Sequence, residues 1–248
     1  MPDQQAERNS SSYPKAGFAT TQWSIVLSVG QPSQSREALA TLCQLYWYPL
    51  YAYVRRKGYQ SAEAQDLTQA FFAELLEKER IQMADQQRGR FRAFLLSSLQ
   101  NFLHNQWREK QAQKRGAGTL PISFDFHDGE NRYFQEPSDE LTPEKIYERR
   151  WAMTFLENSV ANLRSEFEKT GKVELFDNLK AYLGGPSDTV PYREMAEKLG
   201  ISENAVKVAV HRMRRRCREL LLNDIAETVS SPEEVDDELQ QLFAALEV

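Results

Sequence analysis

Residues 189–222 hold the pattern that most restricts the fold of this chain, two helix signals separated by a glycine turn. Pro191 fits the first turn of a helix, where a residue needs no amide hydrogen. Gly200 tolerates the left-handed backbone that ends a helix, and Ser202 can cap the next helix through its hydroxyl group. Two helices joined by so short a turn form a helix-turn-helix, an arrangement that places its second helix in the major groove of DNA.

The second helix of this pair has an apolar face and a cationic face. Its apolar residues recur at the i, i+4, i+7 spacing of a buried stripe: Val206, Val210, Met213, Cys217, Leu220 and Leu221. Between Glu203 and Glu219 the helix also carries six cations and no acid. Such a row of charge repels itself unless a polyanion lies nearby. A solvated surface is the ordinary explanation of a charge run, but directly after this turn the pattern favours DNA binding.

The overall charge hides two basic segments. The net charge of −5 argues against nucleic acid until it is divided along the chain. Residues 88–118 hold seven Lys and Arg against one acid, and residues 205–218 hold six against none. Residues 223–248 hold eight acids and no base. The acidic total therefore comes from segments that flank two basic ones.

Several classes of protein are disfavoured. No apolar run approaches the length of a membrane span, and the polar start has no signal-peptide core, so we expect no membrane partner and a cytoplasmic location. Cys43 and Cys217 are too few for a disulfide framework or a zinc site. The histidines, His104, His127 and His211, lie on three separate segments, and no phosphate loop or nucleophile motif occurs. We therefore expect no enzyme, metal or cofactor.

The spacing of apolar residues is helical almost throughout, which predicts an all-α protein. Helices are expected over 22–29, 34–57, 61–78, 90–113, 155–167, 173–183 and 232–246. Pro49 should kink or restart the second of them, because it lacks an amide hydrogen. A stretch rich in Gly, Pro and acids reads as a flexible linker between two small helical domains. The expected divisions are a leader (1–19), a first domain (20–113), the linker (114–142), the helix-turn-helix domain (143–222) and an acidic amphipathic tail (223–248).

The segment from Asp66 to Lys78 predicts a helix with a polar surface beside its core face. Its core positions are Leu67, Phe71, Leu75 and Leu76. Asp66, Gln69 and Glu74 point elsewhere, with Phe72 near their edge. An exposed aromatic among carboxylates and amides suits a protein-binding surface, whereas an ordinary amphipathic helix would be the simpler explanation.

The segment from Gly89 to Arg108 predicts a basic helix with two stripes. Its core stripe is Phe91, Phe94, Leu95, Leu99, Phe102 and Leu103. A polar stripe of Gln100, Asn101, His104, Asn105 and Arg108 could read bases or phosphates. Aromatics interleaved with Arg suit stacking on unpaired bases, although the same aromatics also suit a protein core.

In this order the three segments resemble region two and region four of the extracytoplasmic-function (ECF) sigma factors of bacterial RNA polymerase. DLTQAFFAELLEK is similar to the polymerase-binding helix of that family. FRAFLLSSLQNFLHNQWREKQ is similar to its promoter-opening helix. YREMAEKLGISENAVKVAVHRMRRRCREL is similar to its region-four helix-turn-helix. Together with residues 39–58, the resemblance covers roughly 150 residues.

The resemblance implies two partners, core RNA polymerase and promoter DNA. The coiled coil of the largest polymerase subunit would be bound by Asp66, Gln69, Phe72 and Glu74. The minus-ten promoter element would be held by the loop before Arg90 and by Arg90, Arg92, Gln100, Asn101, His104, Asn105 and Arg108. The residues expected to lie in the major groove of the minus-thirty-five element are Glu203, Asn204, Lys207, Val208, His211 and Arg212. Its phosphates would be held by Arg214, Arg215 and Arg218.

The chain departs from the family pattern in three places. Ser97 and Ser98 stand where primary sigma factors carry a pair of Trp residues. ECF members generally lack that pair as well, and its loss predicts a narrow promoter range. The segment 156–191 is longer than usual, and the acidic tail is additional. The tail carries an apolar stripe of Val235, Leu239, Leu242, Phe243 and Leu246. It either folds against region four or the polymerase and tempers DNA binding, or only solubilises the chain.

An anti-sigma protein remains a further candidate partner. The main alternative function is a helix-turn-helix regulator that binds DNA as a dimer without polymerase. That alternative explains the turn at Gly200 but leaves the helix at Asp66 and the basic helix from Arg90 without a purpose.

Overall fold

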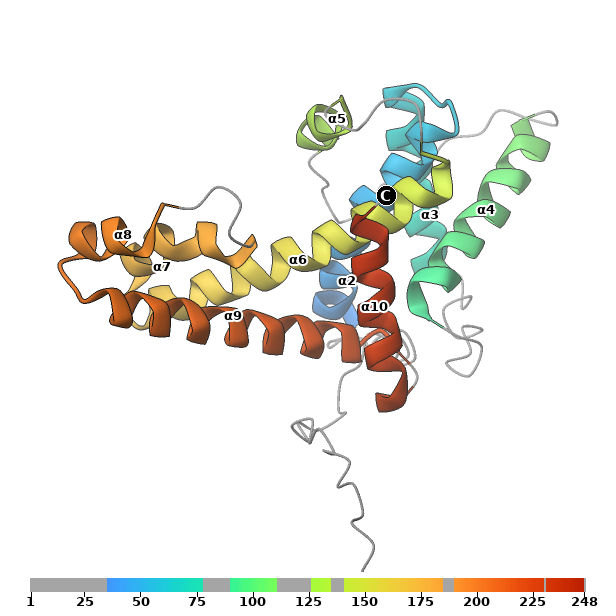
Figure 1. Cartoon of the computed structure of the whole chain (residues 1–248). Helices are drawn as coiled ribbons and strands as arrows, with labels where there is room; N and C mark the ends of the chain where they lie inside the picture. The colour runs from blue at the N-terminus through green and yellow to red at the C-terminus, as the bar shows by residue number, and fades with distance from the viewer. Residues whose placement is uncertain are drawn as a thin grey trace, which may run out of the picture.

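The computed structural model describes residues 35–77, 90–110, 126–134, 141–184, 190–229 and 231–247. All regular structure in these residues is helical (Figure 1), which confirms the all-α prediction. The helices are α2 (Ser35–Arg56), α3 (Ser61–Glu77), α4 (Phe91–Lys110), α5 (Phe126–Phe134), α6 (Pro143–Lys169), α7 (Val173–Leu179), α8 (Tyr192–Leu199), α9 (Glu203–Ala226) and α10 (Val235–Leu246), with 3-10 turns at Lys180–Gly184 and Pro232–Glu234. The expected leader and the helix at 22–29 lie outside the described residues.

Helices α2, α3 and α4 follow the expected bounds within a few residues and build a first core. Pro49 lies inside α2 without ending it, so of the two outcomes expected there, a kink or a restart, the restart does not occur. Gly58 follows α2 with a φ of 96°, a left-handed conformation that favours glycine. At the centre of this core the ring of Tyr46 lies 5.4 Å from Phe91 and 6.1 Å from Phe155, measured between centroids.

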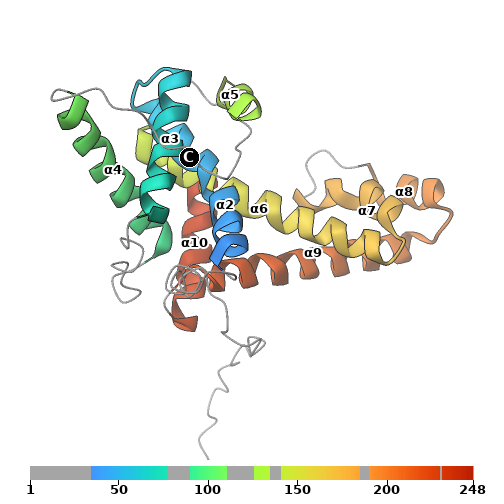
Figure 2. The same cartoon turned by 180° about the vertical axis from the view of Figure 1, so that it is seen from behind.

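Helix α6 belongs to two cores. Its first half places Tyr147, Trp151 and Phe155 in the first core, beside α2. Its second half places Leu163 in a second core with α7, α8 and the start of α9. Figures 1 and 2 show α6 and α9 running together from α7 and α8 to α2 and α10. The expected domain boundary at Pro143 therefore does not separate the cores, because the helix that begins there contributes to both.

Helix α5 lies within the stretch expected to be a flexible linker, and it packs on α2. Glu130 of α5 accepts hydrogen bonds from Arg55 at 3.0 and 2.8 Å and one from the hydroxyl of Tyr51. A Cβ atom at Gly129 would lie 2.8 Å from the ring of Trp47, so α5 approaches α2 as closely as glycine allows. Residues 126–134 are therefore a docked helix, which corrects the linker prediction for this part.

The C-terminal segment also docks. Val235, Leu239, Leu242 and Ala245 of α10 are buried in the first core, and α10 contacts both α6 and α9. Phe243, expected on the same stripe, is 49% exposed because it follows Leu242 by only one position and points about 100° away on the helix. The tail thus closes the first core, and it meets α9 at the C-terminal end of that helix, far from α8 (Figure 1). None of the helices described is long and apolar enough to cross a membrane.

The contact between Glu130 and α2 predicts a dependence of stability on pH. Burial raises the pKa of Glu130, but hydrogen bonds from Tyr51 and Arg55 outweigh it and hold that pKa below its ordinary value of 4.5. A lowered folded-state pKa stabilises above the unfolded value and loses that contribution as pH falls through the folded value. We expect Glu130→Gln to cost about 1–3 kcal/mol at pH 7, and the difference from wild type to shrink below pH 4.5.

Urea unfolding of both proteins at neutral and acidic pH measures this difference. The matched control is Glu168→Gln, which removes a carboxylate from an exposed pair with Arg164 on α6 and should cost little at either pH. A difference between Glu130→Gln and wild type that stays constant with pH would contradict the expectation.

Candidate nucleic-acid interface

The turn between α8 and α9 has the geometry that the sequence predicts. Gly200 ends α8 in the left-handed conformation with φ at 65°. The hydroxyl of Ser202 accepts a hydrogen bond from the amide of Ala205 at 3.2 Å and so caps α9. Pro191 stands one position earlier than expected, at the N-cap of α8 rather than in its first turn. Met195 of α8 is buried in the second core, which holds the two helices together.

The first turns of α9 present a polar surface. Val206, Val210, Met213 and Leu221 are buried, while Cys217 and Leu220 are half-buried, so the predicted core stripe is confirmed. On the other side the structure exposes Glu203, Asn204, Lys207, Val208, His211 and Arg212. An exposed amide, cations and an apolar side chain on one helix face are the groups that read base edges and thymine methyls in a major groove.

The cations of α9 fall into two groups: some are held by other parts of the chain, and some are open to solvent. Arg214 donates hydrogen bonds to the backbone oxygen of Tyr182 at 2.9 and 2.6 Å, so its guanidinium ties α9 to the preceding 3-10 turn rather than standing open for a phosphate. Arg216 pairs with Glu166 at 2.7 Å and Glu219 at 3.0 Å, and hydrogen bonds to Glu166 and then Glu219 raise its pKa further. It thereby joins α9 to α6.

The remaining cations of the helix are more open. Lys207 forms an intrahelical pair with Glu203 at 2.6 Å, and Arg215 lies 3.6 Å from Glu219 with its side chain 71% exposed. Arg212 and Arg218 are exposed and form no hydrogen bond or ion pair with the described part of the chain. These two side chains are therefore the ones most available to DNA phosphates.

Helix α4 exposes most of its predicted polar stripe. Gln100, Asn101, His104 and Asn105 are exposed, and Gln100 donates a hydrogen bond to the hydroxyl of Tyr53 at 3.1 Å. Of the predicted core stripe only Phe94 is less than fully buried. Trp107, 59% exposed, edges a pocket of about 670 Å³ between α4 and the α2–α3 turn. The side chain of Arg108 lies outside the described residues.

The start of α4 differs from the prediction. Arg92 is buried: it donates to Glu238 at 2.7 Å and to Glu148 at 3.1 Å, and its guanidinium lies 4.5 Å from the ring centroid of Trp151. Arg90 pairs with Glu238 at 2.9 Å, with its own side chain 23% exposed. In this arrangement Arg92 is covered and Arg90 is largely covered, so their predicted contact with DNA stays a prediction and would require α10 to move. The cause is α10, which covers this end of α4.

Glu238 is a residue that the sequence reading missed. It is completely buried and meets both arginines at the start of α4. The sequence does contain a signal for it: Glu238 lies three residues after Val235 and four before Leu242, on the apolar face of its own helix. A charge on a buried face needs a partner of opposite charge. Because the tail contains eight acids, the sequence reading did not single out Glu238 as the one that is buried and paired.

Helix α3 shows its polar surface but not the predicted aromatic. Asp66 and Gln69 are exposed and Glu74 is half-buried. Phe72 is completely buried, with its ring 5.6 Å from that of Phe71, so the prediction of an exposed aromatic is wrong. Helix α3 packs against both α2 and α4, and its apolar face is therefore wider than one stripe.

Comparison with known families gives one match. Residues 188–217, which include α8, the turn and most of the polar face of α9, match the family model described as Sigma-70, region 4. No curated protein and no solved structure gave a significant match. Sigma-70 region 4 is a non-enzymatic DNA-binding domain of transcription factors, and the match supports a sigma factor or a related DNA-binding role.

The division of cations on α9 predicts different effects for neighbouring arginines. Arg218→Ala should weaken binding to duplex DNA and lower the slope of log affinity against log salt by about one, because it removes one phosphate contact. Arg216→Ala, the matched control, should leave that slope unchanged and lower thermal stability, since it breaks the pairs with Glu166 and Glu219. Fluorescence anisotropy over a salt series, with thermal melts, measures both. Equal slopes for the two variants would contradict the assignment.

Proposed function

We propose that this protein is a sigma factor of the ECF type, which binds core RNA polymerase in the cytoplasm and directs initiation at a restricted set of promoters. The observation that carries the proposal is the combination, in one chain, of a region-four helix-turn-helix with a rigidly packed α3 whose outer face is polar. A DNA-binding regulator needs only the first of these. The chemistry of RNA synthesis would belong to the polymerase.

Helix α3 suits a protein partner because its polar side chains stand on a fixed support. Asp66 and Gln69 are three residues apart and share one face of the helix. Beneath them Leu67, Phe71 and Phe72 are buried in the first core. A surface held in this way loses little freedom on binding, which is the condition for affinity from a small polar patch. Phe72 would act through the position of α3 and not by direct contact.

Two surfaces suit two parts of a promoter. The exposed amides and His104 on α4, next to the exposed ring of Trp107, offer hydrogen bonds and stacking to unpaired bases. The exposed face of α9, with Asn204 and Arg212, offers base-edge contacts in duplex DNA. A sigma factor uses both kinds of contact, because it opens one promoter element and reads the other as a duplex.

The deciding experiment combines the purified chain with core RNA polymerase and a library of promoter fragments, followed by sequencing of the transcripts. We expect transcripts with defined start points that depend on the added chain. A chain that binds DNA specifically but neither co-purifies with core polymerase nor starts transcripts would be a helix-turn-helix regulator, and the proposal would fail.

The face of α3 can be tested separately. Asp66→Ala combined with Gln69→Ala should reduce retention on immobilised core polymerase about tenfold or more, and both positions are exposed, so the fold should stay intact. Asp236→Ala combined with Gln240→Ala removes the same two exposed groups from α10 and serves as the matched control. Circular dichroism checks folding. Undiminished retention of the α3 variant would remove α3 as the binding surface.

The reading of DNA predicts a further distinction. Asn204→Ala should change which minus-thirty-five sequences are used, because a base-edge contact carries about 1–3 kcal/mol of discrimination. Arg218→Ala should weaken all promoters alike, since phosphate contacts carry no sequence information. Transcript counts from a library randomised at that element measure both profiles. Identical profiles for the two variants would show that α9 is oriented differently in the groove.

A further inference from the structure

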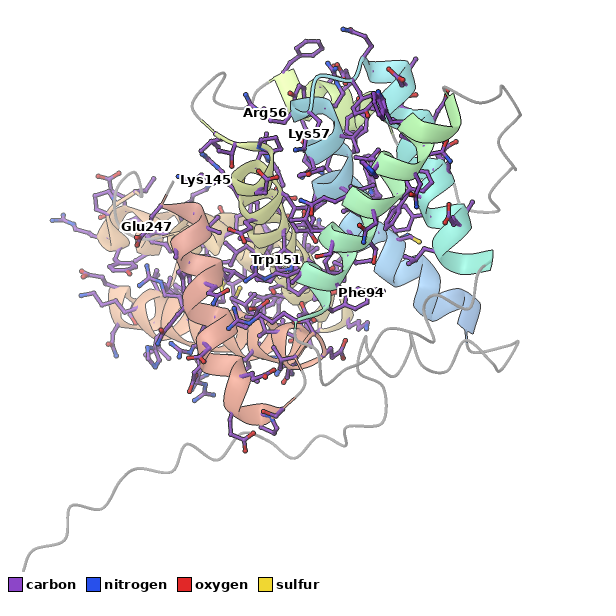
Figure 3. All side chains as sticks on the ribbon, turned by 90° about the vertical axis from the view of Figure 1, so that its right-hand side faces the viewer. Arg56, Lys57, Phe94, Lys145, Trp151 and Glu247 are labelled. Atoms are coloured by element: carbon purple, nitrogen blue, oxygen red, sulfur yellow. The ribbon has the colours of Figure 1, made fainter. Side chains whose placement is uncertain are left out.

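A single carboxylate holds the two arginines at the start of α4. Glu238 is completely buried, with one oxygen 2.7 Å from Nε of Arg92 and the other 2.9 Å from Nε of Arg90. Arg92 is also held by Glu148 of α6 and by the side-chain oxygen of Gln241. In Figure 3 Trp151, over which Arg92 lies, stands at the junction of α10 and the first turn of α4.

This arrangement offers Arg92 the paired oxygen contacts that a phosphate would offer, and Arg90 a single one. Arg92 meets Glu238 through two of its nitrogens, Nε at 2.7 Å and a terminal nitrogen at 3.4 Å. The same fork of donors binds phosphate oxygens in pairs. The carboxylate of Glu238 thus occupies a position that a DNA phosphate could take, on the basic segment that first indicated DNA binding.

Stability alone does not account for a charge at position 238. The rest of the contact is apolar, through Val235, Leu239, Leu242 and Ala245. A buried ion pair gains little over well-packed apolar side chains, because removing the charges from water offsets their attraction. Charged partners are, however, suited to a contact that opens, since each charge can then find water or another partner.

Helix α10 depends on this contact for its own fold. It is 12 residues long, and an isolated helix of that length is marginal in water. Its outer face carries Asp236, Asp237 and Gln240, all exposed. Detachment would therefore unfold α10 and release Arg90 and Arg92 from Glu238, which leaves Arg92 paired with Glu148 alone.

We propose that α10 is an acidic intramolecular cover, which occupies Arg90 and Arg92 in the free protein and is displaced by the phosphates of DNA. The proposal rests on the proposed function only through the assignment of promoter DNA to α4. Before DNA binds, the start of α4 would thus have α10 as its partner. The C-terminal segment would then regulate DNA binding rather than only solubilise the chain.

The first test uses the unaltered protein. Hydrogen exchange of the α10 amides is followed with and without a saturating amount of a labelled forked DNA, which has a duplex and an unpaired strand. We expect DNA to accelerate exchange in α10 while the amides of α2 stay protected. Unchanged protection of α10 at saturation would overturn the proposal.

The second test removes the charge. Glu238→Gln should bind the forked DNA roughly three- to tenfold more tightly at low salt, with a salt slope larger by about one to two, because two cations become available. Asp237→Asn is the matched control: it removes one charge from the same helix at an exposed position. An equal gain in both variants would mean that general tail charge acts, and would overturn the specific role of Glu238.

A double-mutant cycle completes the design. Arg90→Gln should have little effect on DNA affinity in the wild-type background, where the arginine is covered, and should cancel most of the gain in the Glu238→Gln background. Equal effects of Arg90→Gln in both backgrounds would contradict the proposal. Retention on core polymerase is measured in parallel and bears only on the proposed function: a chain that ignores polymerase but releases α10 on DNA fails the first proposal and supports this one.

Discussion

The contact on which the rest of the structure depends is the aromatic stripe of α6 against α2. Trp151 and Phe155 lie 5.3 Å apart between ring centroids, and both are completely buried beside Tyr46. Each large ring removes about 150–250 Å² from water, worth several kcal/mol at about 25 cal/mol per Å². Because the same helix continues into the second core, this burial fixes where the helix-turn-helix stands relative to α2, α3 and α4.

The parts of the fold that the sequence predicts well are those with local causes. The end of α8 follows from Gly200, the start of α9 follows from Ser202, and the buried stripe follows from helical spacing. What the sequence does not reveal depends on a second partner from far along the chain. Phe72 is buried because α3 meets two helices, and Arg92 is buried because Glu238, 146 residues later, reaches it.

The candidate site shows the same difference. From sequence, the six cations of α9 form one uniform row, but in the structure the acids of α6 and of α9 itself divide them. Arg216 serves the packing of α9 on α6, and Arg214 fixes the 3-10 turn of Tyr182. Charge density along a sequence therefore identifies a segment suited to a polyanion, while the three-dimensional positions of the acids decide which of its cations stay open to one.

The span of α6 sets a condition on the proposed binding of two promoter elements. Its 27 residues rise about 40 Å from the first core to the second. Elements named minus-ten and minus-thirty-five are about 25 base pairs apart, which is about 85 Å of duplex. Helix α6 covers less than half of that distance, so reading both elements at once requires the width of both cores or an extension of the chain.

Helix α10 contacts α6, α9 and the start of α4 together and therefore opposes extension. DNA cannot replace the contacts of the aromatic stripe, because those contacts are apolar. It can replace the ion pairs of Glu238, because phosphates can bind both arginines. We therefore expect the closed arrangement to open first at α10.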